Sequence, residues 1–275
     1  MLEWVSLGHE GAILPYPYLP AGAGGRPQEA RYGEMAVAPL YWKIPLDTGS
    51  STYILVGMLA IPKPPIRDIQ RRNSERTRKR LLKSAFSQIY RSGFQGSDIE
   101  TIIDAAGVTK GALYHHFDNK EALGYAVVDE VIAGITLEKW VRPLQNPDDP
   151  IATLIAIVES TSLSADHVRG GCPLNNLAQE MSALDEGFRK RLAKVFDDWL
   201  RAIAGALRDG QKRGLVRAEI DSRETAGFLI ATYEGYISLS KSSQDPQMLQ
   251  AGKRNMAIFL ESLRTPRKRK QRPNV

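Results

Sequence analysis

The sequence predicts an all-α fold, with a short N-terminal three-helix domain followed by a larger helical domain. Apolar residues recur from Ser74 to about Leu263 at the 3.6-residue spacing of amphipathic helices. No stretch after residue 73 alternates apolar and polar residues in the way a half-buried strand does. The composition, 43% hydrophobic and 25% charged in a chain of 275 residues, is ordinary for a globular protein.

Residues 1–72 are expected to form an irregular, poorly ordered extension. Nine of the 16 prolines fall in this segment, and proline interrupts helical hydrogen bonding. The apolar run 54–61 is shorter than the roughly 20 residues that a membrane-spanning helix needs, so no membrane partner is expected. A second interpretation is that the segment is an upstream in-frame extension, with Met35 or Met58 as the true start.

The first domain is expected over residues 73–120. An apolar stripe at helical spacing predicts its first helix; the stripe consists of Leu81, Leu82, Ala85, Phe86 and Ile89. Ser97 and Glu100 have the S-x-x-E spacing of a capping box and predict the start of a second helix. Gly107 is expected to end that helix in the left-handed conformation, and Thr109 is expected to cap a third helix over residues 110–116.

The larger domain is expected over residues 121–263, before a basic tail at 264–275. Its first helix opens at Asn119 and runs to about Trp140, after which three prolines mark a loop. Four further helical stretches follow: from Ile151 to the Gly170-Gly171 break, from Phe188 to Leu207, from the cap residue Asp221, and after Pro246.

The net charge of +6 is distributed unevenly along the chain. Residues 71–125 hold ten Lys or Arg against six Asp or Glu, net +4, and residues 264–275 hold six against none. Residues 126–263 hold 16 against 19, net −3. A confined basic segment favours a polyanionic partner such as DNA. The alternative at this point is a solvated helix face.

The sequence contains no evident catalytic or metal-binding set. The single cysteine excludes a disulfide scaffold and fits a reducing cytoplasm. The H-E-x-x-H, G-x-S-x-G and phosphate-loop motifs do not occur. Two of the four histidines, His115 and His116, fall in the third helix of the first domain, which leaves no metal set. We therefore expect no cofactor, no metal and no enzymatic activity.

Two short helices between Asp98 and Phe117, joined at Ala106-Gly107-Val108, match a helix-turn-helix. In such a motif the second helix faces the DNA. Small residues there leave room for a base edge, and lysine, tyrosine and histidine carry hydrogen-bond donors for phosphate oxygens. The residues of that kind are Thr109, Lys110, Gly111, Ala112, Tyr114 and His115.

The motif itself reads DIETIIDAAGVTKGALYHHF and is followed by DNKEAL. It resembles the N-terminal DNA-binding domain of the TetR/AcrR regulators, closely over residues 75–125 and more weakly to about residue 263. One departure is Ile103, where the family more often has alanine; this requires repacking of the first short helix but does not touch the DNA-facing residues. Residues 1–72 and 264–275 have no counterpart in the family.

The resemblance implies a sequence-specific DNA-binding regulator that acts in the cytoplasm. It places Thr109, Lys110, Gly111, Tyr114 and His115 against DNA, with Lys120 reaching a phosphate from the next helix. The family binds palindromic double-stranded operators as homodimers, in most cases as repressors, and a small molecule in the C-terminal domain usually releases the DNA. The alternative is a non-specific architectural DNA-binding protein that uses the basic tail.

The resemblance also implies a homodimer formed through the last two long helices. The residues that would form this interface are Phe228, Tyr236, Met256, Phe259 and Leu260. The alternative is that these side chains belong to the core of a single chain.

A sensor is expected in residues 170–182, GGCPLNNLAQEMS, which resemble a subgroup of the family. Pro173 fits the first helical position and places Cys172 at the N-cap, where a helix dipole stabilises a thiolate. Cys172 is thus either a switch for an electrophile or oxidant, or a small buried residue at a helix junction. Other side chains that could line an effector cavity, or belong to plain core, are His167, Trp140, Trp199, Tyr233 and Tyr236.

Overall fold

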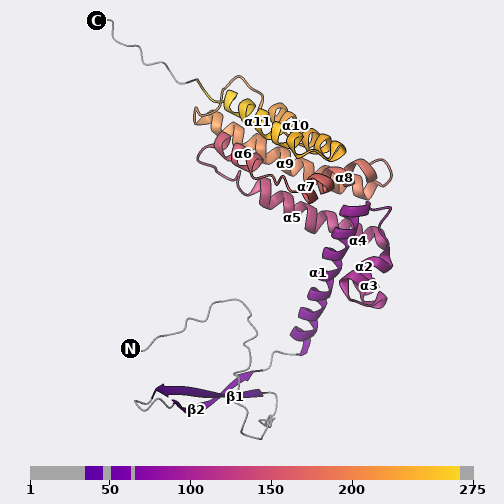
Figure 1. The fold of residues 1–275 in the computed structure, drawn as a ribbon, viewed down its shortest axis with the longest axis vertical. Helices are drawn as coiled ribbons and strands as arrows, with labels where there is room; N and C mark the ends of the chain where they lie inside the picture. The colour runs from indigo at the N-terminus through magenta and orange to yellow at the C-terminus, as the bar shows by residue number, and fades with distance from the viewer. Residues whose placement is uncertain (1–34, 46–50, 63–65, 267–275) are drawn as a thin grey trace, which may run out of the picture. The chain divides into compact units, whose positions relative to one another are not determined.

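The computed structural model describes residues 35–45, 51–62 and 66–266. The chain divides into two compact units, Met1–Ile69 and Gln70–Val275, which are described separately. Figure 1 follows the order of the elements along the chain by colour.

The described part of the first unit is an antiparallel hairpin of β1 (Met35–Pro45) and β2 (Ser51–Pro62). The register pairs Met35 with Pro62 at one end and shifts at a bulge after Leu40. Tyrosine, isoleucine and valine in β2 are residues that favour strands. The hairpin differs from the irregular structure predicted for residues 1–72, because the proline-rich segment still contains runs of β-branched and aromatic residues that favour strands.

The second unit contains most of α1 (Ile66–Ser92), followed by α2 (Ile99–Ala106) and α3 (Lys110–His116). The predicted apolar stripe of α1 is confirmed: Leu81 and Ala85 are fully buried, and Leu82 and Ile89 are nearly so. The helix starts at Ile66, several residues before the expected domain boundary. These three helices form the N-terminal end of the second unit (Figure 1).

The helix predicted from Asn119 to about Trp140 is confirmed, with the Asn119 side chain accepting from Ala122 N at 2.7 Å. It is not uniformly α-helical. It runs through α4 (Lys120–Ala126), a π-helical segment η1 (Val127–Ile132), α5 (Ala133–Thr136) and a second π-helical segment η2 (Leu137–Val141).

The remaining helices are α6 (Pro150–Glu159), α7 (Ala165–Gly170), α8 (Pro173–Met181), α9 (Glu186–Lys212), α10 (Ser222–Ser243) and α11 (Pro246–Ser262). The long helices α9, α10 and α11 lie side by side (Figure 1), with α9 packed on α10, α10 on α11 and α11 on α6. From Ile66 on, the described regular elements are all helices, and the one strand-like pairing there is an isolated bridge between Val216 and Arg264. This confirms the all-α prediction for the second unit.

The end of the described chain is tied to the folded unit. Arg264 contacts the carboxylates of Asp149 and Glu261, each at 2.6 Å, and Thr265 N donates to Leu215 O at 3.1 Å. Asp149 is also the N-cap of α6. Arg264, predicted to open a basic tail, therefore belongs structurally to the helical unit, and residues 267–275 of that predicted tail lie outside the described residues.

Candidate DNA-binding surface and sensor core

The helix-turn-helix is fixed by local hydrogen bonds at each end of its helices. Gly107 ends α2 at φ 59°, and its N–H donates to Asp104 O at 3.0 Å. Thr109 caps α3 by accepting from Ala112 N at 3.2 Å. Both features confirm the sequence prediction, and they set the turn between the two helices.

The predicted capping box at Ser97 and Glu100 is wrong. Asp98 is the N-cap of α2 instead, since its carboxylate accepts from both the N–H and the hydroxyl of Thr101. The buried Ser97 hydroxyl turns the other way and donates to Phe94 O at 2.7 Å. Aspartate and serine are about equally good N-caps, but the Asp98 carboxylate also interacts favourably with the positive end of the helix dipole.

Contacts from α1 hold the helix-turn-helix in place. The hydroxyl of the buried Ser84 donates to Ile102 O at 2.9 Å, and the Arg80 guanidinium donates to Gly107 O at 3.0 Å. Leu113 of α3 is fully buried in the same core. The face of α3 that carries Leu113 is thus anchored in the core. This fixes the direction in which the opposite face of the helix points.

The residues predicted to face DNA lie on that other face. Thr109, Lys110, Gly111, Tyr114 and His115 are exposed, and the aromatic side chain of Tyr114 is 45% exposed. Ala112 is half-buried.

The two lysines of the predicted set have partners within the chain. Lys110 forms an ion pair of 2.6 Å with Glu100, and both side chains are about 60% exposed. Lys120 is half-buried, donates to Gln95 O at 3.3 Å and lies 4.7 Å from the centre of the Phe94 ring. A phosphate could therefore take the place of the exposed Glu100 carboxylate as the partner of Lys110. At Lys120 it would have to draw the ammonium away from Gln95 O and the Phe94 ring.

The basic run on α1 divides into a structural and an exposed part. Arg78 forms an ion pair with Glu130 of η1 and lies 5.1 Å over the Phe117 ring. The exposed members of the run are Arg71, Arg72, Arg76, Lys79, Arg80 and Lys83. Most of this charge therefore faces solvent beside the helix-turn-helix, where it is available to a polyanion.

Two contacts join the helix-turn-helix region to α7 and α8. Glu180 of α8 accepts from the backbone N–H groups of Phe94 and Gln95, both at 2.8 Å. Tyr90 of α1 donates from its hydroxyl to Gly171 O at 2.8 Å. These contacts attach the end of α1 and the turn after it to the predicted sensor segment.

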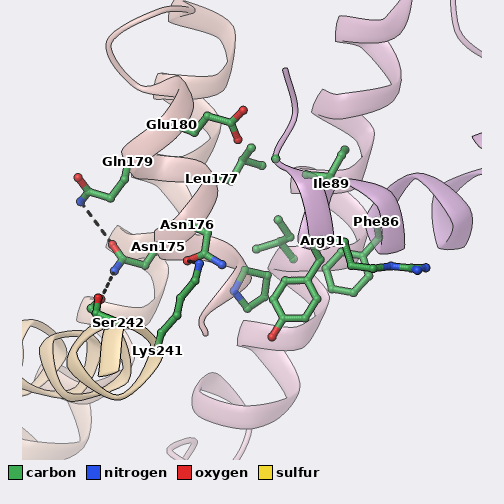
Figure 2. A pocket seen from close by; sticks show the side chains of 15 residues that line it. Phe86, Ile89, Arg91, Asn175, Asn176, Leu177, Gln179, Glu180, Lys241 and Ser242 are labelled. Atoms are coloured by element: carbon green, nitrogen blue, oxygen red, sulfur yellow. Dashed lines mark hydrogen bonds between the residues drawn. The ribbon is translucent and has the colours of Figure 1, made fainter. Parts of the chain in front are cut away.

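A cavity of about 560 Å³ lies next to these contacts, between α1 on one side and α8 and α10 on the other. Figure 2 shows Phe86 and Ile89 of α1 across from Asn175 and Asn176 at the amide-rich start of α8. The Lys241 ammonium of α10 donates to Asn176 Oδ1 at 2.9 Å. The cavity is large enough for a small organic molecule, and its walls come from both the DNA-binding and the sensor side.

The structure brings together three of the six predicted sensor residues in one aromatic cluster. The Trp140 ring lies 4.6 Å from that of Trp199 and 5.0 Å from that of Tyr233, measured between ring centres. All three side chains are buried. The space beside the two tryptophans measures only about 10 Å³, about the volume of one water probe. These tryptophans therefore form packed core.

A polar network that was not predicted from the sequence adjoins this cluster. The Lys139 ammonium donates to the Tyr233 hydroxyl at 2.7 Å and to Thr161 Oγ1 at 3.2 Å. Burial lowers the pKa of Lys139, against the opposing effects of Cys172 and Glu234. Glu234, next to Tyr233 in the chain, is also buried. No motif marks these residues in the sequence; only an ionisable residue inside an otherwise apolar helical run hints at them.

Cys172 stands at the N-cap of α8 with Pro173 in the first turn, as predicted, but its side chain makes no capping hydrogen bond. Burial and the nearby Glu234 carboxylate raise the pKa of the Cys172 thiol well above its ordinary value. These effects favour the second alternative for Cys172, a small buried residue at a helix junction, over a reactive thiolate. Desolvation and a neighbouring negative charge outweigh the helix dipole.

The last two predicted sensor residues lie apart from the aromatic cluster. His167 of α7 is half-buried, burial lowers its pKa, and its Nε2 has no partner among the described residues. The Tyr236 hydroxyl accepts from Asn255 Nδ2 at 3.0 Å, and its ring packs against Gly252 of α11.

The residues expected at a dimer interface also divide into two groups. Met256 and Leu260 are buried in the core of the chain, so their expected role between two copies is wrong. Phe228 is 52% exposed and lies 4.8 Å from the partly buried Phe259 ring, measured between ring centres.

Across the described ranges, none of the helices combines the length and the apolar character that a membrane crossing requires.

Both helical regions of the second unit match models of known protein families. Residues 81–127 match a family described as "Bacterial regulatory proteins, tetR family", and residues 150–256 match one described as "Tetracyclin repressor-like, C-terminal domain". These two stretches cover the helix-turn-helix and most of α6 to α11.

Individual relatives agree with the family models. An uncharacterised HTH-type transcriptional regulator of Lactococcus lactis subsp. lactis is 31% identical over 65% of this chain and 90% of its own. The HTH-type transcriptional repressor DhaR of Mycobacterium sp. (strain GP1) is 28% identical over 62% of this chain and 86% of its own.

Solved structures show the same fold. A TetR transcriptional regulator from Chloroflexus aurantiacus J-10-FL superposes with a TM-score of 0.64 at 28% identity, covering 71% of this chain and all of that one. Reduced E. coli NemR shares the fold, with a TM-score of 0.61 at 23% identity over 70% of this chain and 99% of that one. This protein therefore belongs to the TetR family of DNA-binding transcriptional regulators, which are not enzymes.

Proposed function

We propose that the chain is a homodimeric repressor that binds a palindromic operator through α3 and is released by a small-molecule effector. The observation that carries the DNA-binding part is the exposed face of α3, where Thr109, Lys110, Gly111, Tyr114 and His115 lie together. Leu113 anchors the opposite face in the core. A helix fixed in this way presents its exposed side chains to a major groove. We expect the protein to act in the cytoplasm, where its operator lies.

The dimer is supported by exposed apolar side chains on the last two helices. Phe228 and Leu239 of α10 are 52% and 54% exposed, and Ile258 of α11 is 69% exposed. Large apolar residues gathered on one pair of helices favour a protein partner, and two copies of one surface form a two-fold interface. Two copies of α3 related in this way read half-sites about one helical turn apart or a multiple of it.

The effector part is supported by the cavities that adjoin α8 and α10 and by the contacts of Glu180 with Phe94 and Gln95. A ligand that moves α8 would act on the turn before α2 through these bonds. The raised pKa of the Cys172 thiol favours a non-covalent effector over an electrophile.

The experiment that tests this function is selection of genomic DNA fragments by the purified full chain. We expect enriched fragments to share a palindrome. We also expect affinity for them to exceed affinity for random DNA at equal salt by at least about a thousandfold. Equal affinity for both DNAs would overturn the proposal in favour of an architectural protein bound mainly through phosphates.

The dimer is tested by sedimentation of Phe228→Glu and Ile258→Glu variants. Each change buries a carboxylate in the proposed interface, so we expect monomers and a loss of operator binding. Leu184→Glu is the matched control, because Leu184 is 62% exposed and lies between α8 and α9. A dimer that survives both interface changes would contradict this interface.

A further inference from the structure

Residues 71–80 of α1 carry a dense positive charge that the helix-turn-helix itself does not contain. The segment holds one acid, Glu75, and six basic residues: Arg71, Arg72, Arg76, Arg78, Lys79 and Arg80. Within the described residues, Arg78 is the member of this set that forms an ion pair, with Glu130. The segment precedes residues 81–127, the stretch that matches the TetR family, so the match assigns it no role.

Two contacts show where α3 lies along α1. The Arg80 guanidinium donates to Gly107 O, shortly before α3 begins. Arg78 lies 5.1 Å from the centre of the Phe117 ring, directly after α3 ends. Both ends of α3 are therefore held at the level of residues 78–80 of α1.

The other helix of the motif, α2, lies further towards the C-terminal end of α1. Ser84 donates to Ile102 O, in the middle of α2, at 2.9 Å. Because α2 and the buried Leu113 lie on the inner side of α3, the exposed face of α3 opens towards the N-terminal end of α1. At 1.5 Å per residue, residues 71–77 extend about 10 Å beyond the level of α3. Figure 1 shows this end of α1 continuing past α3.

A duplex bound against the exposed face of α3 would therefore pass beside residues 71–77. Arg71, Arg72 and Arg76 are all exposed there. Arg72, Arg76 and Lys79 also line one shallow hollow on the surface of α1, so these side chains are gathered towards solvent and not folded onto the core. Exposed cations at this place are complementary in charge to a phosphate backbone.

We propose that the N-terminal part of α1 binds the phosphate backbone of DNA just outside the half-site that α3 reads, through Arg71, Arg72 and Arg76. Contacts with phosphates carry no sequence information, so they lengthen the bound segment and raise affinity for any duplex. The position beside a half-site rests on the proposed function, which places α3 in the major groove. Phosphate binding by these arginines does not rest on it.

The first test is the salt dependence of binding by the full chain. In the glutamine set, Arg71, Arg72 and Arg76 are all changed to Gln. The probes are the palindromic fragment recovered by genomic selection and a random-sequence duplex of equal length. We expect the slope of log affinity against log salt to become shallower by about two to three units on both probes. A change of less than about one unit would overturn the proposal.

The matched control removes three exposed cations from α9. They lie on a helix outside the helix-turn-helix and are Arg201, Arg208 and Lys212, each changed to Gln. The net charge changes equally in the two sets, but the control should keep the parent slope. An equal loss of slope in both sets would trace the effect to net charge and overturn the contact with α1.

A lysine set separates the charge from the folding of α1. Changing Arg71, Arg72 and Arg76 to Lys keeps all three positive charges, and lysine forms helices about as well as arginine. Because the contact is electrostatic, this set should keep the parent slope to within about one unit. A slope as shallow as that of the glutamine set would overturn a contact made by charge.

Hydroxyl-radical footprinting of the palindromic fragment locates the contact. At saturating protein, the parent should protect backbone positions inside the palindrome and further positions just outside it. The glutamine set should lose the outer protection and keep the inner one. Outer protection that survives in the glutamine set would overturn the assignment to α1.

The two probes also separate this inference from the proposed function. A parent that prefers the palindrome, with the same slope in the glutamine set, would overturn the contact with α1 and leave the repressor function standing. A parent without preference, whose slope on random DNA falls in the glutamine set, would support phosphate binding by α1 and overturn the repressor function.

Discussion

The carboxylate of Glu180 on α8 accepts a 2.8 Å hydrogen bond from the backbone N–H of Phe94, in the turn that leads from α1 to α2. Its second oxygen accepts from Gln95 N at the same distance. A single side chain of the sensor region thus satisfies two backbone donors of the DNA-binding region. No other carboxylate in the described chain accepts from both of these donors.

Glu180→Ala should lower the free energy of unfolding by about 1–3 kcal/mol, since it removes the partners of two backbone N–H groups, one on the buried Phe94. Urea unfolding followed by circular dichroism measures this. Gln179→Ala is the control, because Gln179 is the exposed neighbour on the same helix. An equal loss in both variants would show that α8 packing, and not this contact, is responsible.

Lys110→Ala should weaken operator binding and lower the slope of log affinity against log salt by about one unit, the loss expected for one phosphate contact. The control is Lys212→Ala, because Lys212 is also an exposed lysine paired with a carboxylate, Asp209 at 2.9 Å. Fluorescence anisotropy over a salt series measures both slopes. An unchanged slope for Lys110→Ala would rule out its phosphate contact.

Two glycine substitutions should separate folding from DNA binding. Gly107→Ala forces a Cβ into a left-handed conformation and within 2.6 Å of an Arg80 nitrogen, at a cost of about 1–2 kcal/mol. Gly111→Ala meets no atom within 4 Å and should gain up to about 1 kcal/mol of helix stability. We expect the second variant to fold well and bind the operator weakly. Full operator affinity in Gly111→Ala would remove Gly111 from the DNA-facing set.

The stability of the protein should depend on pH through Glu234. Its folded pKa of about 7 lies above the ordinary 4.5, so the folded state holds the proton more tightly than the unfolded state. The contribution of Glu234 is therefore most favourable below about pH 4.5 and is lost as the pH rises through 7. The difference amounts to as much as about 3 kcal/mol.

The measurement is the difference between parent and Glu234→Gln unfolding free energies from pH 4.5 to 7.5. We expect the unfolding free energy of the variant to increase relative to that of the parent as the pH rises. The groups that face Glu234 are Cys172, Lys139 and Tyr233; they are present in both proteins and largely cancel in the difference. A difference that does not change with pH would contradict a raised pKa for the buried Glu234 carboxyl group.

Cys172 should react slowly with thiol reagents. Burial raises the pKa of its thiol, and only the thiolate is nucleophilic, so Ellman's reagent at pH 7.5 should react at least about a hundredfold more slowly with the folded than with the unfolded chain. The chain has one cysteine, so the signal has a single source. Cys172→Ser should keep the effector response; its loss would restore the electrophile hypothesis.

The DNA-binding region could be predicted from sequence almost residue by residue because its determinants are local. Gly107, Thr109 and Asn119 each act on a backbone group within a few positions of themselves. The error at Ser97 was also local, since the neighbouring Asp98 side chain caps the same helix end instead.

The sensor region could be predicted only in outline. Glu234 stands between a tyrosine and a glycine in an amphipathic helix, and nothing in that spacing shows that its side chain points inward. Met256 and Leu260 fit either a core or an interface, because both bury apolar surface. Long-range packing settles such positions, and a single sequence does not encode it in any short pattern.

The close pair of Trp140 and Trp199 gives this protein an optical reporter of its own interior. The chain has four tryptophans, and the other two, Trp4 and Trp42, fall in the other unit. With those two changed to phenylalanine, all indole fluorescence would come from the core between η2 and α9. Ligand-induced rearrangement there could then be followed in real time, without a dye or a label.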